Sequence, residues 1–264
     1  MDDKAFAARL ELAIDAARGA GVRTLEFFRK PDLAVELKAD ATPVTLADRT
    51  AEQHVRDRVA ASFPDDGIVG EELPDKSGTS GFRWIIDPID GTQSFIHGVP
   101  LYGTLVGVEH GGQSVIGVLV LPALDEYLYA AVGQGAWHVR GTDSPVAARV
   151  SDVSRLADGL FVSETIKTFY QADRQSAYHA LRDAAGLVRG WGDAFGYALV
   201  ATGRAEVMVD PTFNIWDAAA LQPILEEAGG TFTDWKGNPT IHAKEGIATN
   251  GHVLDEVLAI TRDT

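Results

Sequence analysis

Four apolar runs of strand length follow one another in the middle of the chain, at 83–86, 104–108, 115–121 and 127–132. Glycine-rich turns separate these runs, a pattern typical of short consecutive strands. The middle of the chain therefore predicts an antiparallel meander, around which the other segments have to pack.

Helical patterns lie on the N-terminal side of this meander. Apolar residues at helical spacing predict one helix over 4–28. A second is expected over 46–62, opened by Thr45 as its cap and ended before Pro64. A polar loop containing Lys38 and Asp40 joins the two helices.

Beyond about residue 145, helical and strand patterns alternate. We expect helices over 176–185, 194–202, 217–228 and from 253, and strands near 187, 206–209, 230–233 and 247. Pro223 lies inside the third of these helices, where its missing N–H predicts a kink. Alternation of this kind favours an α/β (α+β) fold of layered sheets and helices. Because no long linker interrupts the chain, we expect an N-terminal half, 1–145, and a C-terminal half, 146–264, to pack as one compact unit.

Charge and composition exclude several classes of protein. The formal charge of -15 and a pI near 4.8 disfavour nucleic acid and anionic membranes as partners. The absence of cysteine excludes disulfides and thiolate metal sites and fits a reducing compartment. No basic start leads into an apolar stretch, and no run approaches the ~20 apolar residues that span a bilayer. We therefore expect a cytoplasmic protein.

The most informative local segment is WIIDPIDGT at 84–92, where an apolar strand ends in Asp87 and Asp90. Because proline cannot continue a central strand, we expect the chain to leave the sheet at Pro88. Asp90 would then cap a helix beginning near residue 92. Gly91 would let a phosphate group approach the backbone amides at the positive end of that helix. The alternative is an Asx turn followed by an ordinary helix cap.

Further acids stand at the ends of predicted elements. Glu71 and Glu72 follow a flexible glycine, and Asp217 begins a predicted helix. A solvated surface pair and a helix cap are the alternative explanations. Carboxylates gathered in one site would raise one another's pKa and would be costly to bury unless cations neutralised them. Oxygen ligands favour magnesium or manganese over zinc, and none of the seven histidines has metal-ligand spacing.

As a set, these motifs resemble the inositol-monophosphatase superfamily. They are GEE at 70–72, DPIDGT at 87–92, and WDAA at 216–219 followed by EAGG at 227–230, and the resemblance covers nearly the whole chain. It implies a layered alpha-beta-alpha-beta-alpha sandwich, lithium-sensitive and magnesium-dependent hydrolysis of a small phosphate monoester, and a homodimer. Bound Mg2+ would also reconcile an anionic substrate with an acidic protein, because the cations reverse the local field.

The resemblance assigns the metal ligands by position. Glu71, Asp87 and the backbone carbonyl of Ile89 would hold the first magnesium ion. Asp87, Asp90 and Asp217 would hold the second, and a third, weaker ion would share Glu71.

The same resemblance assigns catalytic and phosphate-binding roles. Besides Glu71, Thr92 and Asp48 would be catalytic by orienting the attacking water, and Gly91 with Thr92 would bind the phosphate. Lys38 would lie in a mobile loop near the site. Asp48 has a second, compatible explanation, because Thr45-x-x-Asp48 also has the form of a capping box.

Within the superfamily, the chain is most similar to the histidinol-phosphate phosphatase branch, through DGTQSFIHGVPLYGTL at 90–105, RGWGD at 189–193 and TDWKG at 233–237. Asp193 stands where inositol-specific relatives tend to have a small neutral residue, and it would pair with the cationic groups of histidinol phosphate. A helix cap is the alternative. Arg189 would bind phosphate or pair with an acid, and Trp191 would pack or line the pocket. Asp210 would contact the leaving alcohol, where relatives usually place the longer glutamate.

Two other functions stay open. One is an inositol-1-monophosphatase or another sugar or nucleotide phosphatase of the superfamily. The other is a noncatalytic regulatory protein on the same scaffold, which lost carboxylates or a basic face would indicate. The segment GQGAW at 133–137 resembles an incomplete dinucleotide fingerprint, but it lies between strands and we interpret it as a hairpin turn.

Overall fold

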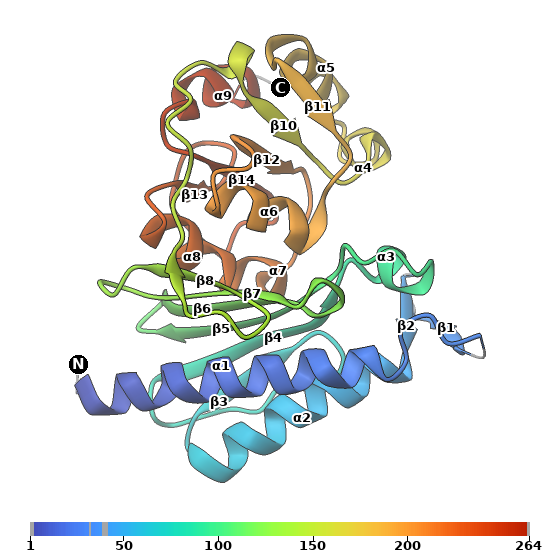
Figure 1. Ribbon diagram of the computed structural model, residues 1–264, viewed down its shortest axis with the longest axis vertical. Coiled ribbons are helices and arrows are strands. Elements are labelled where there is room, and N and C mark those ends of the chain that lie inside the picture. The colour runs from blue at the N-terminus through green and yellow to red at the C-terminus, as the bar shows by residue number, and fades with distance from the viewer. Residues whose placement is uncertain (1–2, 32, 39–41, 263–264) are drawn as a thin grey trace.

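The computed structural model of the chain describes residues 3–31, 33–38 and 42–262. Layers of helices and sheets alternate along the long axis of the molecule, as Figure 1 shows. A helix pair covers one face of a seven-stranded sheet, further helices separate that sheet from a five-stranded one, and outer helices cover the second sheet. The predicted layered sandwich is therefore confirmed.

The first layer is the pair α1 (Asp3–Leu25) and α2 (Leu46–Ser62). Buried alanines on α1, among them Ala13, Ala16 and Ala20, let its backbone approach α2 and the sheet closely. The loop between the helices contains the short strands β1 (Val35–Leu37) and β2 (Pro43–Thr45), whereas Asp40 lies outside the described residues. No helix in the described ranges is long and apolar enough to cross a membrane.

The seven-stranded sheet contains the predicted meander. Its order is β3 (Gly67–Gly70), β4 (Phe82–Asp90), β5 (Gly103–His110), β6 (Gln113–Leu121), β7 (Glu126–Ala131), β8 (Ala136–Arg140) and β9 (Val146–Ala147). Neighbours from β4 to β9 are antiparallel, and β3 is parallel to β4. The residues at 133–135 form the β7–β8 hairpin turn, whose Gly133 and Gly135 N–H groups donate to Glu227. This confirms the hairpin interpretation.

The expectation that the chain leaves this sheet at Pro88 is wrong. Strand β4 continues to Asp90, which pairs with Gly103 of β5, but the register shifts between Asp87 and Asp90. A bulge thus accommodates the missing N–H of Pro88, and its carbonyl accepts a hydrogen bond from the Thr104 hydroxyl at 2.8 Å. The bulge places both aspartates at the end of one strand.

The second sheet has the order β11 (Leu187–Arg189), β10 (Leu160–Val162), β12 (Val207–Asp210), β14 (Gly246–Thr249), β13 (Thr231–Thr233). Between the sheets lie α6 (Asp193–Ala201), α7 (Ile215–Ala219) and α8 (Leu221–Glu227), whereas α4 (Ile166–Gln171), α5 (Gln175–Ala184) and α9 (Leu254–Thr261) lie on the outer side. Short helical segments also span Thr92–Ile96 (α3), Pro122–Leu124 and Leu156–Asp158. One buried core joins the first sheet to α6, α7 and α8.

The expected helix over 217–228 is broken near Ala220, which confirms the predicted effect of Pro223. Proline at 223 cannot donate to the carbonyl of Ala219, four residues earlier. That carbonyl accepts instead from the Ser114 hydroxyl of β6 at 2.5 Å. The interruption separates α7, which carries Asp217, from the longer helix α8.

Candidate active site

A cleft of about 690 Å³ opens where the end of β4 faces the first turns of α4, α6 and α7. Predicted site residues from both halves of the sequence line it: Glu71, Asp87, Ile89, Asp90, Gly91, Thr92, Asp193, Asp210 and Asp217. The fold therefore gathers these acids in one place.

Three aspartates form the centre of the cleft. One carboxylate oxygen from each of Asp87, Asp90 and Asp217 lies within 4.8 Å of the others. Burial raises the pKa of Asp87 well above its ordinary value, and the charges of Glu71, Asp90 and Asp217 raise it further. Burial also raises the pKa of Asp217, to about 6. A set of oxygen donors that repel one another fits a hard divalent cation, whose charge would remove the repulsion.

The turn after β4 brings these acids against α6. Gly91, with φ 87°, is the N-cap of α3, so the prediction that Asp90 caps this helix is wrong. Asp90 is the last residue of β4 and accepts a hydrogen bond from the N–H of Ala194 in the first turn of α6. A Cβ at position 91 would be strained and would lie 2.9 Å from Oδ2 of Asp193. Glycine is therefore required for this approach.

Ile89 and Thr92 present oxygen atoms around the same turn. The Thr92 hydroxyl donates to the carbonyl of Ile89 at 3.1 Å, and the N–H of Ile89 donates to Oδ1 of Asp87 at 3.0 Å. Because the Thr92 hydrogen is used in this bond, the lone pairs of its Oγ1 are left to accept a hydrogen bond from water. The Ile89 carbonyl keeps a second lone pair for a cation.

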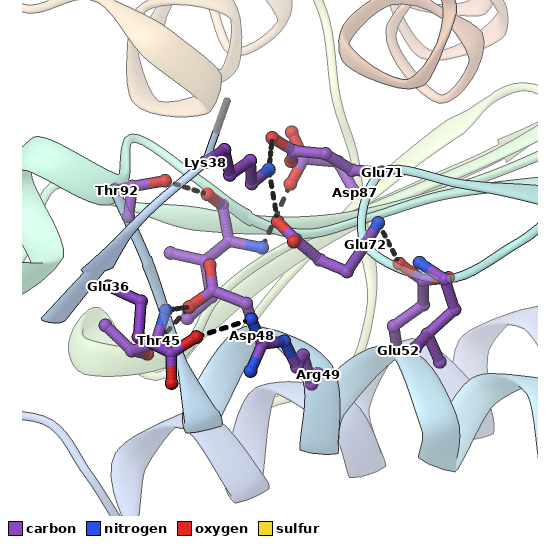
Figure 2. A network of polar contacts seen from close by, with 12 residues as sticks. Glu36, Lys38, Thr45, Asp48, Arg49, Glu52, Glu71, Glu72, Asp87 and Thr92 are labelled. Atoms are coloured by element: carbon purple, nitrogen blue, oxygen red, sulfur yellow. Dashed lines mark hydrogen bonds and ion pairs between the residues drawn. The ribbon is translucent and has the colours of Figure 1, made fainter. Parts of the chain in front are cut away.

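Glu71 lies in a network of charged side chains, shown in Figure 2. The ammonium of Lys38 contacts Oε1 of Glu71 at 2.7 Å and Oε1 of Glu72 at 2.6 Å. Burial raises the pKa of Glu72 to about 7, with the Lys38 hydrogen bond opposing that rise and the charge of Glu71 adding to it. Lys38 thus neutralises part of the charge beside the cleft.

Glu52 holds the segment that carries Glu71, although the sequence did not single it out. Its side chain is fully buried on α2, and its carboxylate accepts a hydrogen bond from the N–H of Glu72 at 2.8 Å (Figure 2). It also accepts one from the N–H of Leu73 at 3.3 Å. Arg56 pairs with Glu52 at 2.7 Å and donates to the Leu73 carbonyl at 2.9 Å. Together they fix the turn that follows Glu71.

Asp48 forms the predicted capping box. Its Oδ2 accepts from the Thr45 N–H at 2.8 Å and from the Thr45 hydroxyl at 2.6 Å, and the Thr45 side chain in turn caps α2. Burial raises the pKa of Asp48, and the nearby charge of Glu71 contributes. The capping explanation is confirmed. Asp48 is buried behind the cleft rather than lining it.

Further acids lie beside the central aspartates, with Asp193 next to Gly91 and Asp90. Burial raises the pKa of Asp193 to about 7, and the charges of Glu164 and Asp217 add to the shift. Asp193 follows the N-cap Gly192, so it does not occupy the cap position of α6. Asp210 accepts a hydrogen bond from the buried Tyr197 hydroxyl at 2.7 Å. Among the described residues, neither Glu164 nor Asp193 has an ion-pair partner.

Arg189 and Trp191 are not among the residues that line the cleft. The Arg189 guanidinium lies 5.9 Å from the Trp191 ring and donates to the Val188 carbonyl. Conversely, sequence patterns missed α4, whose Thr165 cap and Lys167 line the cleft. The hydroxyl at Thr165, one residue before an apolar-periodic segment, was the available helix-start signal.

The chain matches known proteins along nearly all of its length. Residues 7–264 match the model of the inositol monophosphatase family. A histidinol-phosphatase of Chlorobaculum parvum is 44% identical over 93% of each chain. One of Streptomyces coelicolor is 37% identical over 94% of this chain and 95% of that protein.

A solved structure agrees with these matches. The extragenic suppressor protein SuhB of Bartonella henselae superposes with a TM-score of 0.88 and 30% identity, covering 97% of this chain and 98% of that one. The chain is thus similar in sequence and in fold to these proteins over nearly its whole length. The chain belongs to the inositol monophosphatase family and is a phosphoric monoester hydrolase.

Proposed function

We propose that this phosphatase hydrolyses histidinol phosphate to histidinol and phosphate, as in histidine biosynthesis, with Mg2+ as its cofactor. One observation carries the proposal: Asp193 and Glu164 line the cleft beside the central aspartates without a cationic partner among the described residues. A substrate with a phosphate at one end and cationic groups at the other matches this distribution of charge. The relatives named as histidinol-phosphatases support the same substrate.

The acids at the end of β4 and on α7 would hold the cations. Glu71, Asp87 and the Ile89 carbonyl would ligate one ion, and Asp87, Asp90 and Asp217 another, with a third sharing Glu71. Bound magnesium would supply positive charge for the phosphoryl and leaving oxygens and would lower the pKa of the attacking water.

The other residues would bind the phosphate and orient the water. Gly91 and the N–H groups at the start of α3 would face the phosphate oxygens. Thr92 Oγ1 would accept a hydrogen bond from the attacking water, because its own hydrogen is donated to Ile89. Asp48 would act through the electrostatic field, since both hydrogen bonds to its Oδ2 come from Thr45.

The part of the cleft lined by Asp193 and Asp210 would bind the alcohol part of the substrate. Asp193 would pair with the ammonium or imidazolium group. Asp210, held by Tyr197, would contact the alcohol portion. Arg189 would contact substrate only after rearranging from its present position against Trp191.

We also propose a cytoplasmic homodimer. Leu187 on the edge strand β11, Trp191 shortly after it, and Ile166 and Tyr170 on α4 are exposed apolar side chains. Contact with a second copy would cover this surface. Light scattering on the purified chain tests the dimer, and a monomer at micromolar concentration would contradict it.

A substrate panel tests the proposed reaction. We expect kcat/KM for histidinol phosphate to exceed the values for inositol 1-phosphate, adenosine bisphosphate and fructose bisphosphate in the presence of Mg2+. A higher value for inositol 1-phosphate would favour the inositol-1-monophosphatase alternative, which the family as a whole makes the second candidate.

A further inference from the structure

A second cavity, of about 360 Å³, shares no lining residue with the active-site cleft. It lies between the end of β8, the edge strand β9 and the residues that follow α6. Its walls include Arg140, Arg149, Arg204 and His138. The proposed catalytic machinery uses none of these side chains.

The charge of this cavity is opposite to that of the molecule. The chain has 38 acidic and 23 basic residues, yet three arginines and one aspartate, Asp143, line the cavity. Such a cluster would repel itself unless anions compensate it.

Besides Asp143 in the cavity wall, one carboxylate, that of Glu126, contacts several of the basic groups. Oε2 of Glu126 is 3.0 Å from Nε2 of His138 and 3.5 Å from Arg204, and its Oε1 is 3.7 Å from Nε of Arg140. Both arginine contacts are longer than the 2.7–2.9 Å or so of a good charged hydrogen bond. One carboxylate thus pairs incompletely with two guanidinium groups.

Arg149 adds a third positive charge. It is exposed and makes no hydrogen bond or ion pair within the part of the chain that the structure describes. The three guanidinium groups therefore outnumber the two carboxylates, Glu126 and Asp143, at this cavity. Burial lowers the pKa of His138, and the charges of Arg140 and Arg204 lower it further against the opposing effect of Glu126.

We propose that this cavity binds a compact phosphate-type dianion through Arg140, Arg149 and Arg204, at a site separate from the active-site cleft. Guanidinium groups match the geometry of phosphate oxygens with paired hydrogen bonds, and a dianion would supply the charge that Glu126 lacks. The volume is at the lower end of small-molecule sites, so the cavity also admits the phosphate group of a somewhat larger ester.

Calorimetric titration of the metal-free protein tests the site. In EDTA the cleft keeps its acidic side chains without cations, so it should repel phosphate. We expect saturable binding of inorganic phosphate at fixed ionic strength, with about one site per chain. Arg149→Gln and Arg204→Gln should each weaken binding roughly tenfold or more, the scale for loss of a charged hydrogen bond.

Arg155→Gln is the matched control, because it removes an exposed arginine, paired with Asp158 at 2.6 Å, from a different surface. Thermal unfolding checks that each variant folds, and the exposed Arg149→Gln carries the test if Arg204→Gln does not fold. Titration with glycerol phosphate distinguishes the source: tighter binding than inorganic phosphate assigns the site to an ester, and weaker binding assigns it to free phosphate. Absence of saturable binding at millimolar concentrations, binding that persists in the Arg149/Arg204 double variant, or equal weakening by Arg155→Gln would overturn the proposal.

Discussion

Replacing Asp217 with asparagine should stabilise the metal-free protein while abolishing its activity. Burial raises the pKa of Asp217 from 3.8 to about 6. The raised pKa means that this carboxyl contributes to the free energy of unfolding while it is protonated. The contribution is lost as the pH rises from the unfolded pKa of 3.8 through the folded pKa of about 6. Two pKa units correspond to at most about 3 kcal/mol at 1.36 kcal/mol per unit.

The variant also weakens a helix cap. Oδ2 of Asp217 accepts from the Asn214 N–H at 2.7 Å, as part of a capping box on α7. Asparagine can still accept this bond but loses the favourable charge at the helix start, a loss of about 1 kcal/mol. A net gain of about 2 kcal/mol at pH 8 remains, which would raise Tm by roughly 4–8 °C for a chain of this size.

Scanning calorimetry in EDTA at pH 8 and at pH 5 measures this effect. The gain should be largest at pH 8 and smaller at pH 5, because pH 5 lies between the unfolded pKa of 3.8 and the folded pKa of about 6, where only part of the destabilisation has developed. Asp255→Asn, an exposed acid in the first turn of α9, is the matched control and should show no such pH-dependent gain. A less stable Asp217→Asn protein at pH 8, or an equal gain at both pH values, would refute the electrostatic reasoning.

The metal requirement, the role of Asp193 in substrate recognition and the positioning role of Glu52 can each be tested separately. EDTA should abolish turnover, Mg2+ should restore it and Li+ should inhibit it; full activity in EDTA would contradict the metal proposal. Asp193→Asn should lower kcat/KM for histidinol phosphate roughly ten- to a hundredfold and leave glycerol phosphate nearly unchanged, since it removes one charged hydrogen bond; parallel losses would assign Asp193 to the catalytic machinery. Glu52→Ala should weaken Mg2+ binding, measured by calorimetry, roughly tenfold or more through loss of the Glu72 and Leu73 contacts, whereas the exposed Gln53→Ala should not. Unchanged Mg2+ affinity in Glu52→Ala would exclude a positioning role.

Sequence patterns correctly predicted the structure of segments whose conformation depends mainly on their own residues. Helix α2 begins after Thr45 and ends at Ser62, as its cap and Pro64 predict. The strands of the meander follow the apolar runs, and the break before α8 follows from Pro223. The acids of the cleft other than Glu164 were also identified from their motifs or from the family resemblance. Their common location needed the fold, because Glu71 and Asp217 lie in different halves of the chain.

The features that sequence missed depend on contacts between distant segments. Pro88 stays in the sheet because β4 bulges there and the Thr104 hydroxyl of the neighbouring strand β5 donates to the Pro88 carbonyl. Nothing in the segment 84–92 itself indicates this contact. Asp90 bonds to the start of α6 rather than capping α3, and only a glycine at 91 permits that approach. Buried Glu52 has the appearance of an ordinary helical residue until the turn after Glu71 is folded against it. The same holds for function: the ligand acids are recognisable one motif at a time, whereas the side chains that position them are defined only by the tertiary structure.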